Sequence, residues 1–250
     1  MAGLVGIVVL AGCSSAASGP TSTIGRAPTT VVVTALMTTL APATTATTPP
    51  LPVGAASTAT APPSPTGVPG IDATDQFCAA WARYGGTVQI VAVAVNFGGL
   101  DSMQSATLEL EAAPTVVEAV AEISASWPAE IADERDVALD RYLGPYGRRA
   151  EKAVEALRGA GVDDAGEATL QSAWAQVLAT RNPDEPTVDV QLPDDLAAKV
   201  DAGATAFDAA VTPWGSDPSL SADLNEIPRT KAYLAAHCPD LASIGIGDDV

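Results

Sequence analysis

The residues best suited to chemistry in this sequence are three cysteines, Cys13, Cys78 and Cys238, and a single histidine, His237. His237 directly precedes Cys238, and a thiol beside an imidazole is a recurrent nucleophile. Neighbours on a helix nevertheless point about 100° apart, and a disulfide-bonded Cys238 has no thiolate. We therefore expect no catalytic residue here, and we interpret His237 as a favourable charge at the C-terminus of a helix.

The first thirteen residues have the character of an export signal. Residues 4–10 are apolar, which is too short for the roughly 20 residues of a transmembrane helix but typical of a signal peptide. The segment Leu10-Ala11-Gly12-Cys13 resembles the bacterial lipobox. This resemblance implies a signal peptide of residues 1–12, a lipid on the sulfur of Cys13, and a location at the extracytoplasmic face of the cell membrane.

One feature departs from the usual signal-peptide pattern, because no Lys or Arg precedes the apolar run. A start codon assigned too far downstream is the simplest explanation. The alternative is a chance cysteine after an apolar stretch, in a chain with weak export or none.

Cys78 and Cys238 remain once Cys13 is assigned to the lipid. Two leftover cysteines in an exported protein usually pair, so we expect a disulfide between them. The bridge closes a loop of about 160 residues, for which chain entropy gives on the order of 5 kcal/mol at most. The alternative is two reduced and buried thiols.

Other chemical motifs are weak or missing from the sequence. A zinc site needs several Cys or His ligands, and the chain has too few outside Cys13. The segment 217–226 faintly resembles a calcium loop, but it lacks the turn glycine and the spacing of an EF-hand. Acidic residues are plentiful without a spacing that selects a catalytic pair, and no phosphate-binding or nucleophile-elbow motif occurs. We therefore expect no metal, no cofactor and no enzymatic activity.

The four tryptophans are the remaining candidates for a binding site. Trp81, Trp127 and Trp174 lie on apolar helical stripes, where an aromatic residue usually belongs to the core. Trp214 follows Pro213 in an expected loop. It is therefore the best candidate for a ligand or partner contact.

Charge is distributed very unevenly along the chain. The sequence has 30 Asp and Glu, all at or after Asp72, and 12 Lys and Arg, of which only Arg26 precedes it. The C-terminal part therefore carries 30 acids against 11 bases, a net charge of −19. Such a surface repels phosphate backbones, so we expect no nucleic-acid partner.

Residues 13–71 contain ten prolines, fourteen threonines and one charge. Segments of this composition bury too little apolar surface to form a core, which predicts a disordered tether. A tether of this length spans roughly 40 Å as a flexible coil and up to about 180 Å as polyproline II. Its role would be to hold the following domain away from the membrane.

Residues 72–240 show the apolar periodicity of helices, followed by a tail at 241–250. We predict an all-α bundle of six to eight helices, with a strand at 88–95 as a local alternative because that stretch is rich in β-branched residues. The expected helices begin near Asp72, Met103, Pro114, Pro128, Ala150, Asp164, Leu196 and Pro228.

Three short segments of the sequence resemble those of a known group of proteins. They are residues 77–81 (Phe-Cys-Ala-Ala-Trp), 127–134 (Trp-Pro-Ala-Glu-Ile-Ala-Asp-Glu) and 233–239 (Tyr-Leu-Ala-Ala-His-Cys-Pro). They resemble segments of uncharacterised actinobacterial secreted helical domains and lipoproteins. The resemblance implies a small helical bundle with one disulfide, and it implies no known reaction.

These observations favour an envelope lipoprotein with a non-enzymatic, surface-exposed domain that binds or scaffolds another envelope protein. A carrier of a small apolar ligand, held in a cavity between helices, is the first alternative. A hydrolase that uses paired carboxylates is the second.

Overall fold

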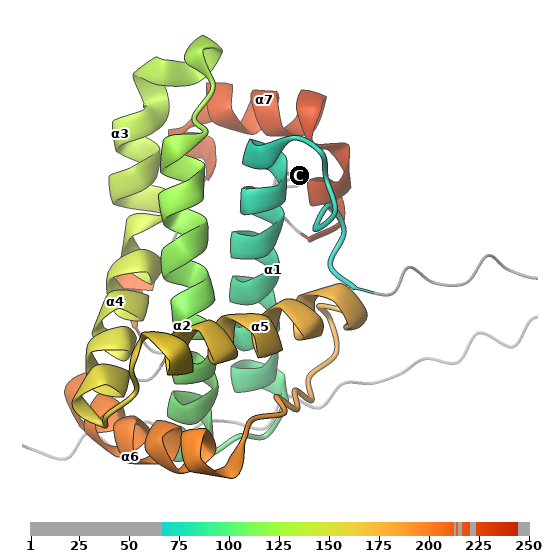
Figure 1. The fold of residues 1–250 in the computed structure, drawn as a ribbon. Coiled ribbons are helices and arrows are strands. Elements are labelled where there is room, and N and C mark those ends of the chain that lie inside the picture. The colour runs from blue at the N-terminus through green and yellow to red at the C-terminus, as the bar shows by residue number, and fades with distance from the viewer. Residues whose placement is uncertain (1–66, 213, 215–216, 221–223, 245–250) are drawn as a thin grey trace, which may run out of the picture. The chain divides into compact units, whose positions relative to one another are not determined.

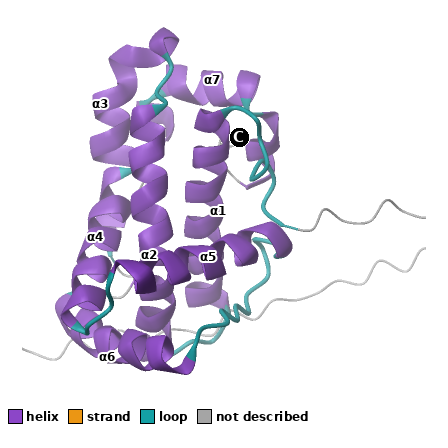
Figure 2. Cartoon of the chain, in the orientation of Figure 1, coloured by secondary structure: helices purple, strands orange, loops and turns teal. Residues whose placement is uncertain are grey.

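The computed structural model describes residues 67–212, 214, 217–220 and 224–244. These residues form helices and connecting loops without a strand, as predicted (Figures 1 and 2). Residues 88–95, for which a strand was the alternative to a helix, lie within the first helix. The α-helices are α1 Gln76–Phe97, α2 Ser102–Ala125, α3 Arg135–Val137, α4 Gly144–Gly159, α5 Asp164–Thr180, α6 Asp194–Ala210 and α7 Pro228–His237.

Helix α2 is the centre of the bundle. It packs against α1, α4, α5 and α6. Helices α1, α2 and α4 run alongside one another, α5 and α6 cross them, and α7 lies across the end of the bundle where α1 begins (Figure 1). The largest fully buried side chains include Trp81, Trp174 and Phe207, so the core draws on helices from both halves of the described chain.

Local sequence explains where the main helices begin. Asp75 caps α1 by accepting a hydrogen bond from the Cys78 amide at 2.9 Å. Asp101 and Gln104 form a reciprocal capping box at the start of α2. Helix α5 begins at Asp164, as predicted, and Asp163 caps it by accepting a hydrogen bond from the Gly166 amide at 3.0 Å.

Pro114 does not divide two helices, contrary to the prediction. It lies buried inside the continuous helix α2. A proline at that position removes one backbone hydrogen bond and usually costs about 3 kcal/mol. Packing of α2 against four other helices offsets that cost, and helix propensity alone gave the wrong boundary.

The single helix expected after Pro128 is three short pieces. A 3₁₀ helix (η1, Ala129–Glu134) leads into α3, and a π-helical turn (η2, Ala138–Tyr142) follows. Ile131 has a non-helical backbone (φ −124°, ψ 23°), and the indole of Trp127 donates to its carbonyl at 2.9 Å. The indole thus takes an acceptor that a regular helix would use.

The packed unit extends slightly beyond the expected limits of 72–240. Val68 and Leu241 both belong to the buried core. A Cβ at Gly86 would lie 2.5 Å from Cγ1 of Val68. The Gly85-Gly86 pair therefore marks a close approach of the chain that enters the domain.

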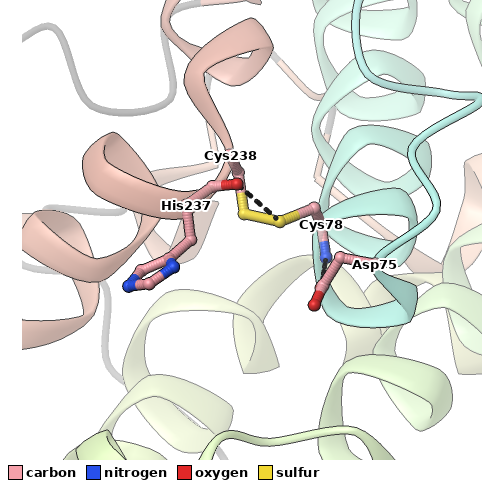
Figure 3. Close-up of a disulfide and its surroundings, with 4 residues drawn as sticks. All are labelled: Asp75, Cys78, His237 and Cys238. Atoms are coloured by element: carbon pink, nitrogen blue, oxygen red, sulfur yellow. Dashed lines mark hydrogen bonds between the residues drawn. A yellow bond between two sulfur atoms is a disulfide. The ribbon is translucent and has the colours of Figure 1, made fainter.

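The disulfide predicted between Cys78 and Cys238 is present, with 5.4 Å between the two Cα atoms (Figure 3). It joins the first turn of α1 to the residue that follows α7. Cys78 Sγ lies 3.5 Å from the carbonyl oxygen of His237. This is a contact without a shared proton, because a bonded sulfur carries none.

Several expectations concern residues outside the described part of the chain. These are the signal peptide at 1–12, the lipid site at Cys13, nearly all of the tether at 13–71 and the end of the tail. Within the part that the structure does describe, no helix combines the length and the apolar character needed to cross a bilayer.

Candidate functional site

A buried ion pair between α2 and α4 is the central feature of the candidate site. Arg149 donates to both carboxylate oxygens of Glu109, from Nε at 2.5 Å and from Nη2 at 3.0 Å. The two side chains are only 7 % and 6 % exposed. Burial raises the pKa of Glu109, and the hydrogen bonds and charge of Arg149 act in the opposite direction.

The other edge of the Arg149 guanidinium holds the segment that follows α6. Nη1 donates to the carbonyl of Thr212 at 2.9 Å and to Oδ2 of Asp217 at 3.0 Å. Asp217 also accepts from the amide and the hydroxyl of Ser219, and these bonds together with Arg149 lower its pKa. Arg149 therefore links α2, α4 and this loop segment.

Trp214, the tryptophan predicted to make a contact, lies over this ion pair. Its ring centroid is 5.7 Å from Cζ of Arg149 and 4.8 Å from the ring centroid of Tyr146. Phe207 lies 5.5 Å from the same Cζ atom, so two aromatic rings flank one guanidinium. Trp214 is half-buried rather than fully exposed, because it packs against α4 while its outer part borders a hollow.

The hollow beside Trp214 has a volume of about 260 Å³ and lies between the end of α1, the start of α2 and the end of α6. A much smaller crevice of about 20 Å³ is lined by residues of α1, α2 and α4, and it shares Glu109, Arg149 and Trp214 with the hollow. The apolar lining of the hollow is Val95, Leu100, Ala106, Phe207, Val211 and Trp214, and its polar lining is Asn96, Asp101, Ser102, Ser105, Glu109, Arg149 and Asp208. Its mixed lining is that of a small-molecule site, and its volume lies just below the usual range of about 300–1,000 Å³.

The remaining candidates from the sequence lie elsewhere. Trp81 and Trp174 are fully buried, and the Trp174 indole donates to the hydroxyl of Thr87 at 2.9 Å. Trp127 is half-buried next to Phe77. The imidazole of His237 points away from the disulfide (Figure 3) and stacks on Tyr233. Cys238 is bonded, so these two neighbours form no nucleophile.

The segment 217–226, considered above as a faint calcium loop, is only partly described. The carboxylate of Asp217 forms an ion pair with Arg149 and accepts a hydrogen bond from the Ser219 hydroxyl. Residues 221–223 lie outside the described part. Across the residues whose positions are given, no group of three or more His, Cys, Asp or Glu side chains could hold a metal ion.

Sequence reasoning missed the ion pair itself, although a signal was present. Glu109 stands three residues after Ala106 and four before Ala113, so it lies in the buried stripe of α2. Arg149 likewise stands four residues before the buried Ala153. One charged residue in each of two apolar stripes predicts a buried pair, since isolated charges are not buried.

A second carboxylate on α2, that of Glu111, predicts that the stability of the fold depends on pH. Burial, together with the nearby charges of Asp201 and Asp189, raises the pKa of Glu111 to about 8. The unfolded chain releases this proton near pH 4.5, whereas the folded chain keeps it. Because the unfolded state then binds fewer protons, this group makes stability fall as pH rises from about 4.5 to 8.

Glu111→Gln removes that effect. Urea denaturation gives the free energy of unfolding of the variant and of the wild type at each pH. From pH 5 to pH 8, we expect the difference between them to shift in favour of the variant by on the order of 2–4 kcal/mol. Glu151→Gln, at an exposed position on α4, corrects for the loss of one negative charge from an acidic protein. A gap between Glu111→Gln and wild type that stays constant over this pH range would contradict the assignment.

Comparison with protein-family models, with curated proteins and with solved structures finds no match to this chain. The function must therefore follow from the residues and geometry of the chain itself.

Proposed function

We propose that this chain is a cell-envelope lipoprotein, anchored through Cys13, whose helical domain is a non-enzymatic binding module. The observation that carries the binding role is the hollow beside Trp214, where a half-buried tryptophan and Phe207 stand next to a fixed polar pair. A rigid apolar wall beside a few fixed polar groups is the usual composition of a ligand site.

The concave form of the site favours a small ligand over a protein partner. A stable protein interface buries about 800 Å² on each partner, usually over a broad surface. The hollow of about 260 Å³ is instead a confined space with room for a small molecule, just below the usual range of ligand pockets, about 300–1,000 Å³. The carrier reading of the sequence, with a ligand between helices, therefore has more support than scaffolding.

A non-enzymatic role is consistent with the chemistry of the site. The carboxylate of Glu109 is bonded at both oxygens to Arg149, and the guanidinium has further acceptors on its other edge. Groups that satisfy one another in this way position the loop and the aromatic rings. They leave no free base or nucleophile at the ion pair.

Mass spectrometry of the full chain purified from its own host tests both halves of the proposal. Under denaturing conditions, the protein should begin at Cys13 and carry the added mass of a diacylglyceryl group. Under native conditions, it should retain a non-covalent small molecule. The first signal depends on the Cys13 sulfur and the second on the hollow.

Two variants separate the two halves. Cys13→Ala should remove the lipid mass, and Trp214→Ala should remove the non-covalent ligand without affecting lipidation. A mature protein that keeps Met1 and carries no lipid would refute the anchor. A native spectrum without a bound molecule would refute the carrier role.

A further inference from the structure

Arg149 is the one cation among the described residues that line the hollow, and its charge is already neutralised. Arg149 faces the two oxygens of Glu109 on one edge and Asp217 and the Thr212 carbonyl on the other. Two carboxylates therefore match one guanidinium. An anionic ligand would have no free positive charge to bind, and it would meet the field of a domain that carries 30 acids against 11 bases.

The rim of the hollow carries two further carboxylates, Asp101 and Asp208. Counting Asp101, Glu109 and Asp208 against Arg149, the lining has a formal charge of −2. Asn96, Ser102 and Ser105 add neutral oxygen acceptors to the same lining. A primary ammonium group, with its three donors, fits this set of acceptors.

The hollow also has an apolar lining. Phe207, Val211 and Trp214 come from the end of α6 and the segment after it, and Val95 comes from α1. The aromatic rings of Phe207 and Trp214 already flank one cation, the Arg149 guanidinium. The site thus places an aromatic and aliphatic wall beside an acidic rim.

We infer that the ligand of this hollow is an organic ammonium ion with an aromatic or aliphatic body. The body packs against Val211 and Trp214, and the ammonium group binds at Asp101 and Asp208. This inference rests on the proposed binding role of the hollow and names the chemical class of the ligand.

Three probes of the same size and different charge test the inference. They are 4-phenylbutylamine, which is protonated at neutral pH as a lysine is, the neutral 4-phenylbutanol, and the anionic 4-phenylbutanoate. Each is titrated into the full chain carrying Cys13→Ala, which needs no detergent, and the indole N–H resonances report binding. We expect the amine to bind about tenfold more tightly than the alcohol, and the acid to bind more weakly than both.

Variants assign the preference to the rim. The double variant Asp101→Asn/Asp208→Asn should remove most of the tenfold advantage of the amine over the alcohol. Asparagine at position 101 still caps α2. Asp136→Asn, at a side chain that is 97 % exposed, is the matched control and should leave the advantage intact. Raising the salt concentration should also reduce the advantage of the amine, because the rim charges are accessible to solvent.

The outcomes separate this inference from the proposed function. If the amine and the alcohol bind equally well and both lose affinity in Trp214→Ala, the ammonium preference is wrong and the binding role stands. If the three probes bind without any effect of Trp214→Ala, or do not bind at all, the hollow is not the binding site and both proposals fail.

Discussion

Replacing Arg149 by Met is expected to lower the free energy of unfolding by about 3–5 kcal/mol, as measured by urea denaturation. The change leaves the carboxylate of Glu109, only 6 % exposed, without its partner inside the bundle. An unpaired buried charge is far more costly than a lost surface ion pair. The variant also removes the two contacts that hold Thr212 and Asp217 in place.

The double variant Glu109→Leu/Arg149→Met isolates the cause. Two apolar side chains of similar volume remove both charges together, so we expect the double variant to regain at least half of the lost stability. Arg158→Met is the matched control, because Arg158 lies on the same helix and binds Glu167 with two nitrogens at the surface. Its replacement should change stability much less than Arg149→Met does.

The tryptophan signals of these variants test the role of Arg149 in positioning Trp214. Trp214 packs against the guanidinium and Tyr146, so its indole resonance should shift in Arg149→Met while that of the buried Trp174 stays in place. Equal stability of Arg149→Met and Arg158→Met would show that the pair contributes no more than a surface contact.

The helical fold followed from the sequence because its signals are local. Asp75 and Asp101 stand at the starts of apolar stripes with helical spacing, and both cap helices in the structure. The disulfide could also be predicted, since the expected lipid site at Cys13 left two cysteines to pair. In each case, a short stretch of sequence or a simple count determined the result.

The errors and the missed features depend on distant contacts. Pro114 remains inside α2 because four other helices pack around α2. The π-helical turn Ala138–Tyr142 has no local sequence signature. Trp214 was the contact residue predicted from the sequence, but its position over Arg149 depends on how the segment after α6 returns to α4. The hollow is a property of packing between helices, which periodicity does not describe.

Removing the disulfide is the second change with a large expected effect. Cys78→Ser/Cys238→Ser should lower the free energy of unfolding by about 2–5 kcal/mol, because the unfolded chain is no longer constrained across a sequence separation of 160 residues. The fold should survive, since α7 has a second attachment at its other end. There Glu134 accepts from the amides of Arg229 and Thr230 at 3.0 and 2.7 Å and from the Thr230 hydroxyl at 2.8 Å.

The loss should therefore be concentrated at one end of α7. Hydrogen exchange should accelerate most from Leu234 to Leu241, near the missing bridge, and least at Thr230, where Glu134 still binds. A reductant should reproduce the destabilisation in the wild type and have no effect on the double variant. Uniform acceleration along α7 would show that Glu134 does not hold the helix by itself, because the helix would then depend on the bridge along its whole length.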